Sequence, residues 1–395
     1  MIIQTLTTDY AGKRGPLFWL ALKTSVLTVL TLGFYRFWMK TRLRRFYWSS
    51  IRPGGIPLEY TGTAVEKLMG FLIAVVFLAF YIGVFNLILV FLSFSLLNGS
   101  LAAYILSFVG LIPIYFYAQY RARRYVLART RWRGLRFGID PAAWGYAGRA
   151  LLHWGLTILT LGVLLPRQVF KLEKFRIDRT WFGRERFTQQ GRWTMLLPAA
   201  THYFIGLGLT ILAGLLGAID PAGFGLLPLG LPWLLVGWLH FRIRSFHIMA
   251  AHKRLGENIG FTANPRTWRV IRIYLAGGLL IWVSLFAIIM AAVFAIMILF
   301  ATIDIANLDL QALGQAFSAG GQLLVLFVAG FAYFGFFILG GVLRQIFLTQ
   351  PMMHHYAETL IVGNSHHLNG IAQRPRDEFA ESEGFAEALD IGAAI

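Results

Sequence analysis

The residues best suited to chemistry are arginines and lysines that are grouped with aromatic side chains in short basic stretches. The first stretch follows an apolar run that ends in Thr31-Leu32-Gly33, and shorter versions start at Arg121 and Arg242. A basic group near an anionic membrane surface contributes on the order of 1 kcal/mol of binding free energy. We therefore expect these stretches to bind anionic phospholipid or an anionic solute. The candidate residues are Arg36, Lys40, Arg42, Arg44, Arg45, Arg121, Arg123, Arg124, Arg242 and Arg244.

Two alternative roles for these stretches compete with ligand binding. Basic residues of membrane proteins mark the loops that stayed in the cytoplasm, so the arginines could serve only to fix topology and to anchor helices. Arginine mixed with aromatic residues is also typical of nucleic-acid surfaces. Nucleic acid is the weaker alternative, because the basic stretches directly adjoin long apolar segments.

Common catalytic and metal-binding motifs are missing from the sequence. It contains no cysteine, no H-E-x-x-H, no G-x-S-x-G and no Walker loop. The pairs His354-His355 and His366-His367 match no usual zinc spacing. His202 and His240 fall inside apolar segments, where a hydrogen bond to a neighbouring helix is their simplest role. We expect neither an enzyme nor a metal or other cofactor.

The composition indicates that a membrane is the main solvent. Of the 395 residues, 57% are hydrophobic and only 14% are charged, whereas soluble domains have roughly 25% charged residues. The apolar stretch at residues 68–97 is 30 residues long, and about 20 residues suffice to span a bilayer core. Membrane topology is therefore the first interpretation of the formal net charge of +18.

Six apolar segments are predicted to cross the membrane in three close pairs. The links within pairs contain no lysine or arginine, whereas residues 121–136 hold seven arginines and residues 167–192 hold eight lysines and arginines. The positive-inside rule places these basic links in the cytoplasm. The predicted crossings are residues 68–97, 101–118, 194–219, 223–241, 270–302 and 322–343.

Two further apolar segments conflict with this charge pattern. Residues 144–165 lie between two basic links, so a single crossing would export one of the links. We expect this segment and the similar residues 17–35 to be re-entrant or interfacial helices that begin and end on the cytoplasmic side. A true crossing with an outside N-terminus is the alternative for residues 17–35. Both segments contain Thr-Leu-Gly, in which glycine suits a helix C-cap. The motif residues are Thr31, Gly33, Thr160 and Gly162.

Short extended pieces follow the basic stretches, as in Gly134-Leu135-Arg136-Phe137, and predict short cytoplasmic strands. The predicted fold is an all-α polytopic membrane protein. It is internally repeated and has three transmembrane hairpins, two re-entrant or interfacial helices and these short strands. The predicted divisions are a first repeat at 1–137, a second at 138–262, a third hairpin at 263–350, and a cytoplasmic histidine-containing segment with an acidic tail at 351–395.

The sequence LTLGFYRFW at residues 30–38, the arginine-rich helix after it and the second LTLG at residues 159–162 resemble the YjgN-like family of bacterial inner-membrane proteins. The resemblance covers roughly residues 18–367. The second copy departs from the pattern, with Leu164-Leu165-Pro166 in place of Tyr35-Arg36-Phe37. The family is a domain of unknown function, so the resemblance implies a polytopic inner-membrane location and supplies no catalytic residues. Genome-neighbourhood association of such proteins with membrane metallopeptidases is a loose indication of a partner.

Two functional classes fit these observations. The first is a passive or weakly coupled transport protein or channel whose basic cytoplasmic face attracts anions. The second is a non-transporting scaffold or regulatory subunit of a membrane complex, with a membrane protein such as a protease as its partner. Transport is the first expectation, although no carboxylate lies deep within a predicted crossing, where coupled carriers commonly place one. In both classes the basic loops and the C-terminus face the cytoplasm.

Overall fold

The computed structural model describes residues 5–80, 83–84, 87–97, 111–301 and 319–375, which belong to two compact units. Unit 1 comprises Met1–Ala11, Trp48–Thr267 and His355–Ile395, and unit 2 comprises Gly12–Tyr47 and Trp268–His354. Each unit therefore draws on segments that are far apart in the sequence. The predicted acidic tail, the link at 98–100, most of the link at 303–321 and part of the predicted crossing at 101–118 lie outside the described residues.

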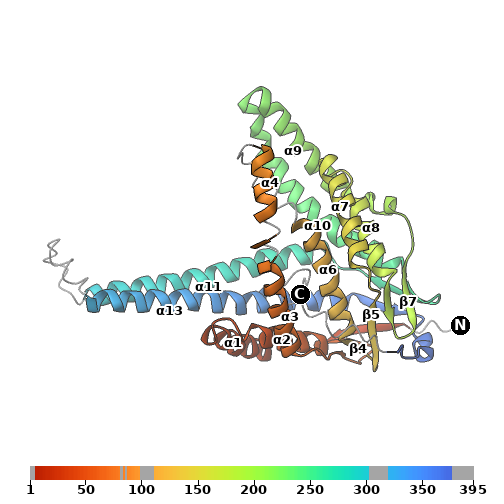
Figure 1. Ribbon diagram of the computed structural model, residues 1–395, viewed down its shortest axis with the longest axis horizontal. Helices are drawn as coiled ribbons and strands as arrows, with labels where there is room; N and C mark the ends of the chain where they lie inside the picture. Colours follow the sequence, from red (N-terminus) through yellow and green to blue (C-terminus); the bar gives the residue numbers. More distant parts are fainter. Residues whose placement is uncertain (1–4, 81–82, 85–86, 98–110, 302–318, 376–395) are drawn as a thin grey trace. The chain divides into compact units, whose positions relative to one another are not determined.

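A ten-stranded antiparallel sheet lies in unit 1, so the prediction of an all-α fold was wrong (Figure 1). The order across the sheet is β2-β1-β10-β9-β8-β7-β6-β5-β4-β3. The two end strands, β2 and β3, are consecutive in the sequence and come close together, so the sheet curls into a nearly closed barrel. The strands are β1 (Leu6–Tyr10), β2 (Ile51–Pro53), β3 (Leu58–Tyr60), β4 (Thr130–Trp132), β5 (Leu135–Ile139), β6 (Thr180–Phe182), β7 (Glu185–Gln189), β8 (Lys253–Leu255), β9 (Ile259–Ala263) and β10 (Leu360–Gly363).

Tight turns and alternating side chains produce this sheet. Between β4 and β5, Arg133 and Gly134 both have positive φ, of 52° and 77°, as a two-residue type I′ hairpin turn requires. Because successive side chains on a strand point to opposite faces, β1 and β3 to β10 each send one or two apolar residues into a common core. The buried residues of this core are Trp132, Ile177, Phe182, Phe187, Leu255, Ile259, Val362 and Leu368.

Helices connect neighbouring strands of the sheet in unit 1. The α7–α8 pair runs from the end of β5 to the start of β6, and the strand residues at those two points, Ile139 and Thr180, are directly paired. Residues 140–179 therefore leave the sheet and return to the same place. The helices of unit 1 are α3 (Ala64–Phe80), α4 (Leu87–Leu97), α6 (Leu111–Ala128), α7 (Ala143–Leu159), α8 (Leu165–Ile177), α9 (Thr201–Ile219) and α10 (Leu227–Ala251), with 3₁₀ turns at Trp193–Leu196, Pro198–Ala200, Pro221–Leu226 and Ser365–Gly370.

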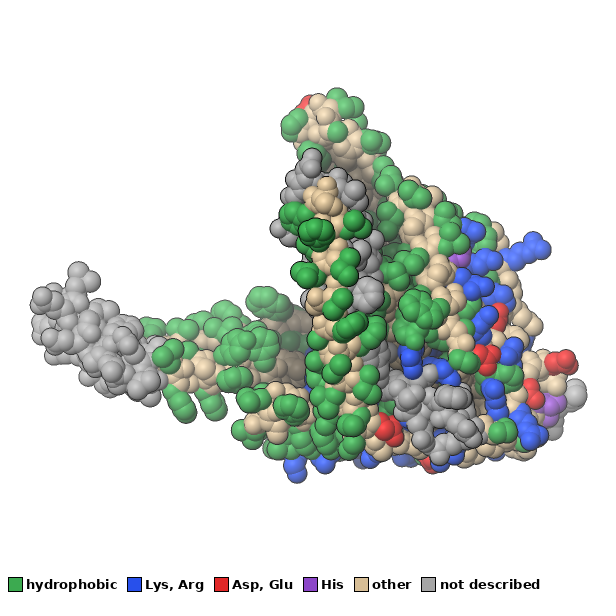
Figure 2. Space-filling model, in the orientation of Figure 1, with side chains coloured by type: hydrophobic (Ala, Val, Ile, Leu, Met, Phe, Trp, Pro, Cys, Tyr) green, Lys and Arg blue, Asp and Glu red, His purple; other side chains and the backbone are tan. Residues whose placement is uncertain are grey.

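Helices α9 and α10 form a closely packed apolar hairpin. A Cβ atom at Gly206 would collide with the backbone of Leu234, and one at Gly237 would meet the carbonyl oxygen of His202 at 2.5 Å. Glycines at such points let two helix backbones approach closely, as is usual for helices in membranes. Hydrophobic side chains cover the visible surface of this hairpin, whereas arginine and lysine side chains gather over the sheet and α8 (Figure 2).

Unit 2 consists almost entirely of helix. It holds α1 (Arg14–Leu30), most of α2 (Arg36–Ser50), α11 (Thr267–Ala301), α13 (Ala319–Arg344), a π-helical turn at Gln345–Thr349 and the start of α14 (Gln350–Glu358). Inside this unit the Tyr47 hydroxyl donates a 2.7 Å hydrogen bond to the side-chain oxygen of Gln345, and the side-chain amide of Gln350 donates to the carbonyl of Gly12 at 3.1 Å. These bonds tie its N-terminal helices to its C-terminal ones.

Four helical segments among the described residues are long and apolar enough to cross a membrane. They are Trp193–Ile219, Pro221–Ala251, Thr267–Phe294 and Ala329–Glu358, and they correspond to the last four of the six predicted crossings. The first predicted hairpin falls on α3, α4 and the start of α6, and parts of it lie outside the described residues. The described part of the chain therefore gives four candidate spans in place of the predicted six.

Candidate anion-binding pocket

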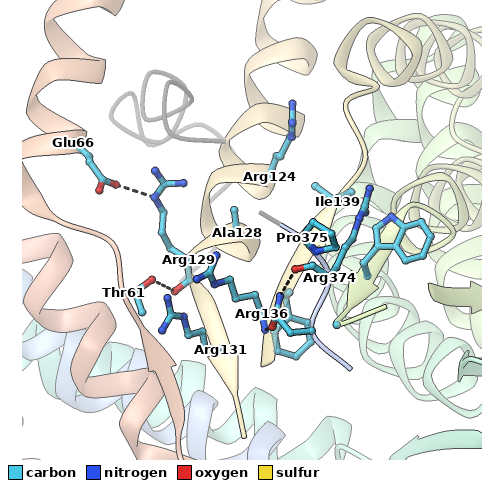
Figure 3. A pocket seen from close by; sticks show the side chains of 15 residues that line it. Thr61, Glu66, Arg124, Ala128, Arg129, Arg131, Arg136, Ile139, Arg374 and Pro375 are labelled. Atoms are coloured by element: carbon cyan, nitrogen blue, oxygen red, sulfur yellow. Dashed lines mark hydrogen bonds and ion pairs between the residues drawn. The ribbon is translucent and has the colours of Figure 1, made fainter. Parts of the chain in front are cut away.

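An arginine-lined pocket of about 270 Å³ lies against the outer face of β4, β5 and β6 in unit 1 (Figure 3). Its other walls come from the start of α3, the end of α6 and the segment 373–375. Among the residues that the structure describes, five arginines and a single carboxylate line it, so the site attracts negative charge. The lining residues are Thr61, Glu66, Arg124, Ala128, Arg129, Arg131, Arg136, Phe137, Gly138, Ile139, Trp181, Gly183, Gln373, Arg374 and Pro375.

Strand register brings two of the arginines face to face. Arg131 on β4 and Arg136 on β5 are direct cross-strand partners, an arrangement that destabilises a sheet when both residues carry the same charge. Glu59, the partner of Arg131 on β3, offsets part of this repulsion. An anion held between the two guanidinium groups would offset the rest, and Figure 3 shows both side chains on the same side of the pocket as Arg129.

The pocket also contains a donor without an acceptor. The Nε of Arg131 is buried and has no hydrogen-bond partner within the part of the chain that the structure describes. The great majority of buried polar groups in proteins are hydrogen-bonded, so this donor suits a ligand oxygen. Arg129 differs, because its Nε donates to the carboxylate of Glu66 at 2.8 Å.

A glycine provides the free volume. Gly138 on β5 lies opposite Trp181 on β6, and a Cβ atom at Gly138 would meet no described atom within 4 Å. Any larger side chain at this position would extend into the pocket. Trp181 is held in place by Asp140, whose carboxylate accepts a 2.6 Å hydrogen bond from the indole N–H.

The C-terminal segment supplies the remaining wall. The side-chain oxygen of Gln373 accepts a 2.9 Å hydrogen bond from the backbone N–H of Arg136, and the guanidinium of Arg374 lies 4.6 Å from the ring centre of Trp181. Arg374 is also 3.8 Å from Asp140. The segment therefore adds a fifth cation to a site that is otherwise built from α3, α6 and the sheet.

Guanidinium groups bind phosphate and carboxylate oxygens through paired hydrogen bonds, and phosphate in particular matches several arginines at once. The described part of the lining has one carboxylate, Glu66, and that group is already bonded to Arg129. The arrangement is therefore suited to hold an anion by its oxygens.

A family model described as "Bacterial protein of unknown function (DUF898)" matches residues 5–293. The chain belongs to this family. The match confirms the resemblance to a bacterial family of unknown function, and comparison with curated proteins and with solved structures gives no match. Within the DUF898 match lie every pocket residue from α3, α6 and the sheet, whereas the wall at 373–375 lies beyond it.

Of the ten anion-binding candidates expected from the sequence, Arg124 lines the pocket of this DUF898 protein. The other four candidates of unit 1 lie elsewhere: Arg121 donates to the Tyr117 hydroxyl, Arg123 pairs with Glu173 at 3.6 Å, and Arg242 and Arg244 are exposed on α10. The remaining five, Arg36, Lys40, Arg42, Arg44 and Arg45, lie on α2 within unit 2.

The pocket residues that sequence reasoning missed are Glu66, Arg129, Arg131, Arg136 and Arg374. Arg129, Arg131 and Arg136 belong to the basic link that was assigned to topology. The available signal was the glycine turn, which Arg131 and Arg136 flank, each beside an aromatic residue, Trp132 or Phe137.

The two Thr-Leu-Gly motifs form the same turn. Leu32 and Leu161 both have φ of 50°, and the glycines that follow have φ of 95° and 94°. In each turn the glycine N–H donates a 2.7 Å hydrogen bond to a carbonyl five residues earlier. Each threonine hydroxyl oxygen also accepts a backbone N–H four residues later, at 2.9 Å for Thr31 and 3.2 Å for Thr160. The motif ends α1 and α7 in one geometry, and its residues line no part of the pocket.

A second group of charges lies between α6, α8 and β8 in unit 1. Glu173 is 2.6 Å from Arg176 and 3.6 Å from Arg123. Burial opposes ionisation of Glu173, but the charges of Arg176, Arg123 and Lys253 outweigh it and lower the pKa of Glu173 to about 2. Burial also lowers the pKa of Lys253, with Glu173 acting in the opposite direction. One carboxylate thus holds three cations together.

The histidines take part in local packing. The rings of His202 and His240 are 5.4 Å apart, and the Nδ1 of His240 is 3.3 Å from the hydroxyl of Thr267. The Nε2 of His355 accepts the backbone N–H of Arg266 at 2.9 Å. Among the described residues, no group of three or more histidines and acids could hold a metal ion.

Proposed function

We propose that this DUF898 protein is a bacterial membrane protein that binds a phosphate-bearing anion in the arginine-lined pocket. The supporting observation is the pairing of Arg131 with Arg136 across β4 and β5, beside a buried Arg131 donor that lacks a partner among the described residues. The ligand is either the headgroup of an anionic phospholipid or a small soluble phosphate compound, since both present the same oxygens.

The position of the pocket favours a regulatory or scaffolding role over transport. Its lining residues come from the sheet, α3, α6 and the segment 373–375, and none belongs to the four candidate membrane spans. We therefore infer that a ligand held there lies off any path across the bilayer. We therefore propose that ligand binding reports phospholipid or phosphate to a partner protein in the membrane, and that the protein catalyses no reaction of its own.

We further propose that the sheet faces the cytoplasm and that the spans lie in the inner membrane. The support is the charge of the segments that form the sheet, because residues 121–136 and 167–192 together carry fifteen lysines and arginines and the sheet contains strands from both. The charge of this face and the four candidate membrane spans of the chain argue for anionic phospholipid and against nucleic acid as its partner.

Ligand titration in nanodiscs tests the proposal. The first arm titrates glycerol 3-phosphate into the full-length protein in phosphatidylcholine nanodiscs, and the second measures phosphatidylglycerol retained by the protein by native mass spectrometry. Arg131→Gln combined with Arg136→Gln should weaken binding at least about tenfold in the arm that detects the ligand, since hydrogen bonds to charged groups contribute about 1.5–3 kcal/mol each.

Two further variants sharpen the result. Gly138→Leu keeps every charge but fills the pocket, so it should weaken binding as much as the double arginine variant. Arg184→Gln removes an exposed arginine that does not line the pocket, and should bind like the wild type. Binding in the first arm identifies a soluble phosphate compound, and binding in the second identifies a lipid headgroup. Failure of both arms, or equal weakening by Arg184→Gln, would contradict the proposal.

A further inference from the structure

The interior of the barrel contains an apolar cavity of about 260 Å³. Strands β2 to β10 each contribute at least one residue to its wall, and α10 and the turn at Ser365–Gly370 contribute the others. The cavity shares Phe137 with the arginine-lined pocket, but it lies on the opposite face of the sheet. Its lining is Ile51, Pro53, Leu58, Trp132, Phe137, Phe182, Phe187, Phe246, Ala250, Lys253, Leu255, Phe261, Leu360, Val362 and Leu368.

The size and lining of the cavity fit a hydrocarbon chain. Apolar cavities of this kind stay dry and bind apolar molecules, because water finds no polar partners in them. At about 30 Å³ for a group the size of a water molecule, 260 Å³ accommodates roughly eight or nine methylene-sized groups. A diacyl lipid has far more hydrocarbon than this volume admits, whereas a single chain of medium length fits.

A charged side chain in the cavity wall favours an anionic head group on such a ligand. Among the described lining residues, Lys253 alone is charged. It lies on β8 with its side chain on the same face as Leu255, a residue of the barrel core. The charges of Glu173, Arg123 and Arg176 act on Lys253, and these four groups carry a net charge of +2 when all are ionised, because three are cations and one is an anion.

We propose that the barrel binds a medium-chain fatty acid, with its hydrocarbon chain among the aromatic residues of the cavity and its carboxylate at Lys253. The carboxylate would lower the net charge around Lys253, Glu173, Arg123 and Arg176 from +2 to +1. This site is independent of the phosphate site proposed in the arginine-lined pocket, which lies against the outer face of the sheet. A fatty acid carries no phosphate, and its chain requires the interior of the sheet.

Photo-crosslinking with decanoic acid that carries a diazirine on its chain tests this site. The full-length protein in phosphatidylcholine nanodiscs is irradiated with the probe, and the labelled peptides are mapped by mass spectrometry. We expect labels on the peptides that contain the strands β4 to β10, and we expect unlabelled decanoate to compete with the probe. Methyl decanoate, which has no charge, should compete about tenfold less well, because the loss of one charged hydrogen bond has about that effect.

Variants separate the cavity from the lipid-facing surface. Lys253→Gln should reduce barrel labelling about tenfold, Lys253→Arg should retain it, and Lys171→Gln, an exposed lysine on α8, should leave it unchanged. Val362→Phe should abolish labelling by filling the cavity. If Val362→Phe prevents folding, the lysine variants and the two competitors still test whether the barrel binds the fatty acid. Labels confined to α9, α11 and α13, or equal labelling in Lys253→Gln and the wild type, would overturn the proposal.

Discussion

Arg129 donates a 2.8 Å hydrogen bond from its Nε to the carboxylate of Glu66, which lies 63 residues earlier in the chain. The hydroxyl of Tyr125 donates to the same carboxylate oxygen at 3.0 Å, and burial raises the pKa of Tyr125, so its hydroxyl stays protonated. Glu66 is the single acid among the described residues that line the arginine pocket. It therefore sets how much positive charge the pocket presents to a ligand.

Replacing Glu66 by Gln should tighten anion binding. The change removes the negative charge while leaving a side-chain oxygen that can accept from Tyr125, so the affinity for glycerol 3-phosphate should rise roughly threefold to tenfold at low ionic strength and less at high salt. Calorimetric titration at two salt concentrations measures the effect. A lower affinity than that of the wild type would show that Glu66 mainly positions Arg129.

The charge cluster around Glu173 makes the free energy of unfolding depend on pH in the acidic range. The pKa of Glu173 is lowered from 4.5 to about 2 in the folded protein, so its ionisation stabilises the fold above pH 4.5 and this contribution is lost as the pH falls through 4.5 toward 2. The shift means that ionised Glu173 contributes on the order of 3 kcal/mol to the free energy of unfolding at pH 7.

Glu173→Gln tests this dependence, since it leaves Arg123, Arg176 and Lys253 without their carboxylate. We expect the thermal midpoint at pH 7 to fall by more than about 5 °C, and the difference from the wild type to shrink below pH 4. Thermal unfolding monitored by tryptophan fluorescence across that pH range provides the measurement. A constant difference at every pH would assign the effect to packing alone.

Glycine packing between α9 and α10 should be sensitive to a single methyl group. A Cβ atom at Gly206 would collide with the backbone of Leu234, whereas one at Gly208 would meet no described atom within 4 Å. Gly206→Ala should therefore destabilise the hairpin by about 1–3 kcal/mol, and Gly208→Ala should have little effect or stabilise the helix slightly. Equal unfolding midpoints for the two variants would contradict this account of the hairpin.

The sheet makes a strict prediction about topology. Arg133 and Arg184 lie in the β4–β5 and β6–β7 turns of one continuous sheet, so they must share one side of the membrane. Ala222 lies in the 3₁₀ turn Pro221–Leu226, at the start of the candidate span Pro221–Ala251 and next to the end of the span Trp193–Ile219, and should be on the other side. Because the chain has no cysteine, single cysteines at these positions can be labelled in intact cells with an impermeant maleimide. Only Ala222→Cys should react, and reaction of one arginine position without the other would refute the continuous sheet.

Hydropathy could predict the apolar helices because their signal is local. Each span needs about 20 apolar residues in a row, and the stretches at 194–219 and 270–302 provide them without reference to any other part of the chain. The sheet has no such signal. Its strands are three to five residues long, too short for alternation to stand out, and β1 pairs with β10 through Leu6 and Val362, which are more than 350 residues apart in the sequence.

The candidate site was predictable only in outline. The density of arginine at residues 121–136 indicated an anion-attracting face, and Arg124 was among the named candidates. The pocket itself depends on which arginines share one face, and that is set by the register between β4 and β5 and by the small size of Gly138. Arg374 joins from a segment more than 200 residues away, so no local pattern could connect it to the others.

The place of β10 in the sheet has a consequence for synthesis. This strand, Leu360–Gly363, lies between β1 and β9, so β1 must wait for a strand that is synthesised much later before both of its edges are paired. Until then β1 and β9 expose backbone donors and acceptors that can pair with other chains. An mRNA truncated before codon 360 would leave those strand edges permanently unpaired. Its product would have inserted helices and an open barrel, and would be a substrate for bacterial quality-control proteases.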